Sequence, residues 1–203
     1  MIRSLLGLSL LLVSASAAAT VMVRVPLEDM VRDSQGVVRG RVTQVGTQLV
    51  IRGASADPMT VSQIAVDEWI VGEGGSQLRM REHGGSHGRG GMAVAATPRY
   101  SVGEEVIIVL EADPESDGRY HRTYAMAQGK FAVLRGVPGT PDRVVRDTRE
   151  VGFARWVGGV MSVEEGELSS VLLGTFLARV RAAARLGTGS GAPLGQTGPG
   201  AAP

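Results

Sequence analysis

Apolar and polar residues alternate over short segments of the chain, which is the pattern of half-buried β-strands. In residues 35–45, Val38, Gly40 and Val42 alternate with polar side chains, and Gly40 on the inward side predicts a tight bend. From Thr60 to Val71, apolar residues occupy both faces. This second strand should therefore lie in the middle of a sheet.

A third strand is predicted from Gln77 to Glu82, where the alternation is the most regular in the chain. Leu78 and Met80 should point inward. Arg79 and Arg81 should then point outward, toward solvent.

The remaining strands are marked by apolar runs and turns. Residues 106–110 form a continuous apolar run, short enough for a strand buried on both faces. A fifth strand is predicted from Tyr120 to Leu134 with a bulge at Gly129, and residues 144–153 can add a hairpin. Gly84 to Gly91 holds five glycines, which predicts a mobile loop or a hairpin tip. Together these elements predict a mainly β fold, a small five-stranded OB-like barrel.

Two helices are predicted outside the strands. A short N-terminal helix covers residues 26–31, because Pro26 suits a first turn and apolar side chains share one side. Ser162-Val163-Glu164-Glu165 matches a capping box, which places the start of a C-terminal amphipathic helix that runs to Leu186 and packs on the barrel. Its expected apolar face consists of Leu168, Val171, Leu172, Phe176, Leu177 and Val180.

The first residues have the three zones of an export signal: a cation at Arg3, an apolar run from Leu5 to Val13, and small residues up to Ala19. We expect cleavage after Ala19 and a protein without a stable membrane anchor, periplasmic or secreted. The predicted organisation is a signal peptide at 1–19, the barrel at 20–160, the C-terminal helix at 161–186 and a disordered Gly/Pro/Ala tail at 187–203.

Composition narrows the function classes. Loss of the signal removes Arg3 and leaves as many basic as acidic side chains, 20 of each. Nucleic-acid binding is not indicated, because it requires an excess of basic residues, and aromatic residues are only 4% of the chain. The absence of cysteine excludes disulfides, thiolate metal sites and thiol catalysis.

Two sets of side chains are candidates for binding a partner. Arginines can form a cationic face that binds acidic groups, although charges that alternate on a strand are first of all a solvated face. These arginines are Arg79, Arg81, Arg89 and Arg99. Trp69 and Trp156 can be exposed anchors or core residues, and the core is the more common place for an indole.

Catalytic and metal motifs are weak. Gly84-Gly85-Ser86-His87-Gly88 has the letters of a serine nucleophile elbow but lacks the strand and helix that the motif requires. Glu82, His83 and His87 are potential metal ligands, and His121 can complete the site if its strand faces the loop. His83 and His87 could bind one metal ion only if a helix brought them together, and the glycines around them disfavour a helix. Solvated histidines are therefore the simpler interpretation.

Three segments resemble a widespread group of uncharacterised exported bacterial proteins: 37–42 (VVRGRV), 102–111 (VGEEVIIVLE) and 127–133 (AQGKFAV). The resemblance covers roughly residues 25–134. The strand order is also similar to the netrin-like OB module of tissue inhibitors of metalloproteinases. Those inhibitors chelate zinc through an N-terminal cysteine, and this chain has none, so inhibition cannot be carried over.

These observations lead to one main hypothesis and two alternatives. The main hypothesis is an exported, non-enzymatic binding module without a cofactor, whose partner is a protein or a surface polysaccharide. The first alternative is a metal-binding or metal-dependent hydrolytic protein that uses Glu82, His83, His87 and His121. The second is a purely structural component of the cell envelope.

Overall fold

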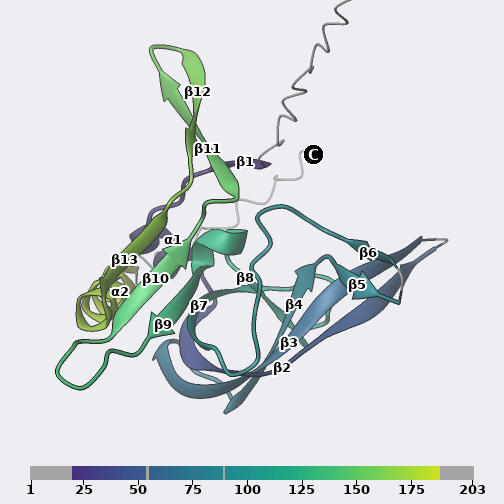
Figure 1. The fold of residues 1–203 in the computed structure, drawn as a ribbon, viewed down its shortest axis with the longest axis horizontal. Helices are drawn as coiled ribbons and strands as arrows, with labels where there is room; N and C mark the ends of the chain where they lie inside the picture. Colours follow the sequence, from purple (N-terminus) through teal and green to yellow (C-terminus); the bar gives the residue numbers. More distant parts are fainter. Residues whose placement is uncertain (1–19, 54, 89, 188–203) are drawn as a thin grey trace, which may run out of the picture.

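The computed structural model describes residues 20–53, 55–88 and 90–187, and within them the chain is mainly β with two α-helices (Figure 1). The helices are α1 (Leu27–Asp33) and α2 (Leu173–Gly187), and a 3₁₀ turn, η1, spans Met126–Gly129. The mainly β class with one helix near each end is thus confirmed. The predicted signal and the predicted tail, apart from Gly187, lie outside the described residues.

Eight strands form the main sheet in the order β13-β10-β9-β7-β2-β3-β4-β8. In chain order they are β2 (Gly36–Arg52), β3 (Ser55–Val71), β4 (Gln77–His83), β7 (Glu105–Ala112), β8 (His121–Thr123), β9 (Lys130–Leu134), β10 (Arg143–Asp147) and β13 (Leu168–Leu172). Neighbours are antiparallel except β4 and β8, which run parallel at Met80 and His121. Strand β8 also pairs with β7 in antiparallel fashion.

Two smaller sheets complete the described chain. β11 (Val151–Val157) lies between β1 (Thr20–Val23), to which it is parallel, and β12 (Val160–Glu165), to which it is antiparallel. Figure 1 shows the β11–β12 hairpin extending away from the main sheet. The short strands β5 (Gly85–His87) and β6 (Gly90–Met92) form a hairpin, so the prediction of a glycine-rich hairpin tip is confirmed.

The core lies on both faces of β7, as its continuous apolar run predicts. Ile107 and Val109 pack with both helices, in the cluster that also holds Met30 and Phe176. The alternate residues of β7 face a second cluster. Its buried members are Val38, Val42, Ile64, Leu78, Met80, Tyr100, Val106, Ile108 and Leu110. The inward positions predicted for the first and third strands are therefore confirmed.

The C-terminal helix begins later than predicted, at Leu173. The predicted capping box is wrong, because Ser162 to Glu165 are part of β12, where Ser162 pairs with Arg155. Gly158 and Gly159 both have positive φ and form the two-residue turn that sends the chain back as a hairpin. The residues predicted as the first half of the apolar helix face, Leu168 to Leu172, form β13 instead.

The predicted strand from Tyr120 to Leu134 is also wrong as a single element. It is divided into β8, η1 and β9, because Ala125 and Met126 have positive φ, at 51° and 56°, which no β-strand allows. Gly129 is the last residue of η1 rather than a strand bulge.

The hairpin predicted for residues 144–153 does not form. β10 pairs with β9 and β13, whereas β11 pairs with β1 and β12. Thr148 separates the two strands, and its amide and hydroxyl both donate to the carbonyl oxygen of Glu167, each at 3.0 Å. The chain therefore passes from one sheet to another at this point.

Candidate functional site

The three predicted partner-binding arginines that the structure describes, Arg79, Arg81 and Arg99, do not form one exposed face. Arg79 is exposed on β4, where its Nη2 donates to the Tyr120 hydroxyl at 2.6 Å. Arg99 is exposed elsewhere, within ion-pair distance of Glu150 at 3.2 Å. Arg89 lies outside the described residues.

Arg81 is buried, which corrects the prediction that it faces solvent. Its Nε donates to Oδ2 of Asp113 at 2.5 Å, and both side chains are almost entirely enclosed. The ring of Tyr120 lies 5.2 Å from the guanidinium carbon. The segment that follows β7 therefore covers the outer face of β4 at this position, which the alternation along β4 alone does not reveal.

The four predicted metal ligands are also separated. Glu82 points into the core, where its Oε1 accepts hydrogen bonds from the amide and the hydroxyl of Thr123. His83 is its neighbour on the strand and so points to the opposite face. His87 is exposed in β5, and Nδ1 of His121 lies 3.2 Å from Oε1 of Gln35. Within residues 20–53, 55–88 and 90–187, no group of three His, Cys, Asp or Glu side chains lies together as a metal site.

Burial shifts the pKa values of Glu82, His83 and His121. It raises the pKa of Glu82 to about 7, although the hydrogen bonds from Thr123 act in the opposite direction. It lowers the pKa of His83, with Arg122 adding to the effect, and it lowers the pKa of His121. The Tyr100 hydroxyl lies 2.6 Å from that of Thr123, so a buried chain of polar groups leads from Tyr100 to Glu82. The continuation of the inward series Leu78, Met80 to Glu82 was the sequence signal for this buried acid.

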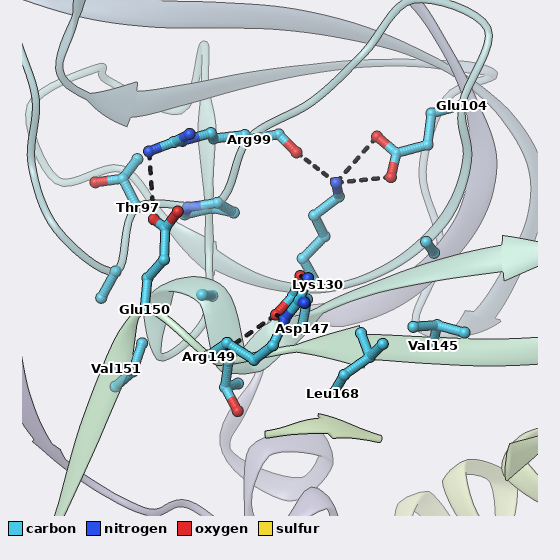
Figure 2. A pocket seen from close by; sticks show the side chains of 15 residues that line it. Thr97, Arg99, Glu104, Lys130, Val145, Asp147, Arg149, Glu150, Val151 and Leu168 are labelled. Carbon is cyan, nitrogen blue, oxygen red and sulfur yellow. Dashed lines mark hydrogen bonds and ion pairs between the residues drawn. The ribbon is translucent and has the colours of Figure 1, made fainter. Parts of the chain in front are cut away.

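A cavity of about 500 Å³ lies beside η1, between the end of the main sheet and the segment that precedes β7 (Figure 2). Its charged side chains are already paired. Nζ of Lys130 lies 2.7 Å from Glu104, Arg149 lies 2.7 Å from Asp147, and Arg99 pairs with Glu150. The hydrogen bond from Arg149 lowers the pKa of Asp147. Three basic and three acidic groups thus neutralise one another in a site where sequence reasoning had identified only Arg99.

The sheet of β1, β11 and β12 presents the largest departure from the sequence predictions. Trp156, expected in the core, is 70% exposed near the tip of β11. Trp69 is half-buried and packs against the second core cluster, and its Nε1 donates to the carbonyl oxygen of Gly75 at 3.1 Å. Only Trp69 therefore follows the prediction.

Strand register places five exposed apolar side chains on one face of this sheet. Trp156 pairs with Met161, and Ala154 pairs with both Val23 and Val163. Because side chains at alternate positions share a face, Val21 also lies on it. We call this surface the hairpin face; it consists of Val21, Val23, Trp156, Met161 and Val163, which are 47–72% exposed.

The opposite side of the same sheet is attached to the body. Val151 and Phe153 are buried there against Ala96. On the hairpin face, the side chains of Val21 and Val163 approach each other over Gly152, where a Cβ atom would lie only 2.8 Å from Cγ1 of Val163. The sequence signal for this hairpin was the Gly158-Gly159 pair between two apolar segments, which the sequence reasoning missed.

Comparison with known proteins finds no match for this chain among protein families, curated proteins or solved structures. None of the helices in the described part of the chain has the length and apolar character needed to cross a membrane.

Proposed function

We propose that this chain is an exported, non-enzymatic module that binds another protein through the hairpin face. One observation carries the proposal: five apolar side chains are exposed together on one face of a sheet whose other face packs against the body. Contiguous exposed apolar surface is characteristic of interaction sites, and Trp, which this face carries at position 156, is among the residue types that most often dominate binding energy.

The composition of the hairpin face favours a protein over a polysaccharide. Sugars require hydrogen-bonding groups beside an aromatic ring, whereas four of the five side chains of this face are aliphatic or Met. The nearby ion pair of Arg155 and Glu164 lies on the other face of the hairpin, because these residues alternate with Trp156 and Met161.

We propose that an OB-like barrel supports this face. The supporting observation is the series of pairings β7–β2, β2–β3, β3–β4, β4–β8 and β8–β7, which returns to the strand from which it starts. The parallel β4–β8 contact is a single residue pair, so this seam is the weakest part of the ring. The same five strands lie within the region that resembles exported bacterial proteins.

Export is part of the proposal. Cleavage after Ala19 would make Thr20 the first residue of the mature chain, and β1 begins at Thr20. The new N-terminus would then contribute Val21 and Val23 to the hairpin face. Mass spectrometry of the protein recovered from outside the cytoplasm should therefore find a chain that starts at Thr20, and a chain that retains Met1 would contradict export by cleavage.

Binding is tested by capture from the exported fraction with the tagged mature chain. Trp156→Glu places a charge on the hairpin face, and Val137→Glu is the matched control, because Val137 is 71% exposed in the loop between β9 and β10, at the end of β10 away from β11. The mature chain and Val137→Glu should retain the same protein at a fixed stoichiometry, and Trp156→Glu should lose it. Retention of that protein by Trp156→Glu, or recovery of a polysaccharide in its place, would overturn the proposal.

A further inference from the structure

Successive side chains of β9 and β10 point alternately to two different cavities, one on each face of the main sheet. Lys130 of β9 and Asp147 of β10 line the cavity with paired charges described above. Their neighbours Phe131 and Arg146 point to the opposite face, toward α1 and α2, as the period of two requires. The second cavity lies on that face and has a volume of about 450 Å³.

The floor of this second cavity is apolar. It is built from Leu27, Phe131, Val144, Val171 and Phe176. The rings of Phe131 and Phe176 are 4.6 Å apart, so the strand and helix that carry them are packed directly against each other. A volume of this size is within the range of small-ligand sites, which are mostly apolar with a few polar groups.

Three arginines from three separate parts of the chain line the same cavity. Arg24 precedes α1, Arg146 belongs to β10 and Arg179 belongs to α2. Only one carboxylate, that of Glu28, lines the cavity with them, and it accepts hydrogen bonds from Nε and Nη2 of Arg179 at 3.1 and 2.7 Å. The described lining therefore carries an excess of positive charge, unlike that of the first cavity.

Within the described part of the chain, Arg24 and Arg146 form no hydrogen bond or ion pair with a carboxylate. Both lie beside aromatic rings: the Arg24 guanidinium carbon is 4.0 Å from the Phe153 centroid and that of Arg146 is 5.9 Å from the Phe131 centroid. Burial lowers the pKa of Arg146, and the charges of Arg24 and Arg179 lower it further, while Glu167 acts in the opposite direction. Like charges held close together in a partly desolvated site are unfavourable unless an anion joins them.

We propose that this cavity binds an amphiphilic organic anion, with its acidic head group between Arg24 and Arg146 and its apolar tail on the phenylalanine floor. Guanidinium groups form paired hydrogen bonds with carboxylate, sulfate and phosphate oxygens, so each of these head groups is suitable. The tail must be short, because the floor is limited to the space between β9, β10 and the two helices. This site is separate from the hairpin face and does not depend on the proposed protein partner.

Calorimetric titration of the mature protein tests the proposal with four probes. Octanoate and octyl sulfate carry both the tail and the charge, 1-octanol carries the tail alone, and acetate carries the charge alone. Octanoate and octyl sulfate should bind with one site per chain, and 1-octanol and acetate should each bind at least tenfold more weakly. Binding of octanoate should also weaken as the salt concentration increases, because the attraction is partly electrostatic.

Variants assign the binding to this cavity. Arg146→Gln should lower the affinity for octanoate at least tenfold, and Arg146→Lys should retain part of it. Arg149→Gln, in the first cavity, and Trp156→Glu, on the hairpin face, should leave the affinity unchanged. Equal affinity of the wild-type protein and Arg146→Gln, equal binding of octanoate and 1-octanol, or no binding of octanoate by a folded wild-type protein would each overturn the proposal.

Discussion

Oε1 of Glu82 on β4 accepts two hydrogen bonds from Thr123 on β8, at 2.8 Å from the amide nitrogen and 2.6 Å from the hydroxyl. These bonds lie where β4 and β8 run parallel, and that pairing extends over a single residue pair. A buried carboxyl group thus joins two strands whose backbones contribute little to their own contact. The protonation of Glu82 should therefore affect the stability of the fold.

Stability should decrease as the pH increases toward neutrality. Burial raises the pKa of Glu82 from 4.5 to about 7, so the folded state favours the protonated carboxyl. The stabilisation from this group is complete below the unfolded pKa and is lost as the pH rises through about 7. A shift of this size corresponds to about 3 kcal/mol in the free energy of unfolding.

Glu82→Gln tests this prediction, because an amide oxygen can accept both hydrogen bonds from Thr123 and stays neutral. The variant should equal the wild-type protein in stability near pH 4 and exceed it near pH 8 by up to about 3 kcal/mol in urea unfolding. His83 and His121 titrate in both proteins, so the difference between the two isolates Glu82. A constant difference over this pH range would show that Glu82 is ionised throughout.

Removal of Asp113 should strongly destabilise the protein. Its carboxylate is buried with Arg81 and also lies 3.0 Å from Nη2 of Arg122. Asp113→Ala leaves the guanidinium groups of Arg81 and Arg122 with only the more distant, partly exposed Glu115, at 3.8 and 3.7 Å, so we expect a loss of about 3–5 kcal/mol in the free energy of unfolding. Asp57→Ala breaks the more exposed pair with Arg52 and should cost much less stability. Similar losses for the two variants would contradict the importance of the buried pair.

Gly40 should not tolerate a side chain. A Cβ atom there would lie 2.3 Å from the carbonyl oxygen of Ala65 and 2.8 Å from Cγ2 of Ile64. Gly40→Ala should therefore lower the free energy of unfolding by about 1–3 kcal/mol. Gly46→Ala, on the same strand, is the control, because a Cβ atom at Gly46 meets nothing within 4 Å. A control variant as unstable as Gly40→Ala in thermal unfolding would contradict the packing argument.

Replacement of Arg146 by an apolar residue should stabilise the protein when no ligand is present. Arg146→Met removes one of three like charges from a partly buried site and retains the apolar stem, so we expect a gain of about 1 kcal/mol. Arg149→Met, on an exposed side chain paired with Asp147, should leave the stability almost unchanged. A clear loss of stability in Arg146→Met would indicate that the arginine supports the fold rather than a ligand.

Local patterns in the sequence were sufficient to predict the strands whose apolar and polar residues alternate regularly, and also the strand that is buried on both faces. The inward positions of Leu78 and Met80 were predicted correctly, as were α1 and the glycine-rich hairpin. The C-terminal region was misread because Ser162 to Glu165 satisfy the letters of a helix cap while pairing with β11. Gly158 and Gly159 turn the chain so that β12 pairs with β11. This pairing decides the structure of Ser162 to Glu165, and a motif of four residues does not reveal it.

The candidate sites were less accessible to sequence reasoning. The burial of Arg81 depends on a distant segment that supplies Asp113, and the exposure of Trp156 depends on where β11 leaves the main sheet. Arg24, Arg146 and Arg179 are far apart in the chain and approach one another only through the packing of β10 with the helices. None of these relationships has a local signal in the sequence.

Site-specific photo-crosslinking in the cells that produce the protein tests the central claim most directly. A photoreactive residue at Met161 lies on the hairpin face, and the same residue at Val137 provides an exposed control in the loop between β9 and β10. We predict a covalent adduct with one other protein from position 161 that position 137 does not form. No protein adduct at position 161, or the same adducts from both positions, would contradict binding through the hairpin face.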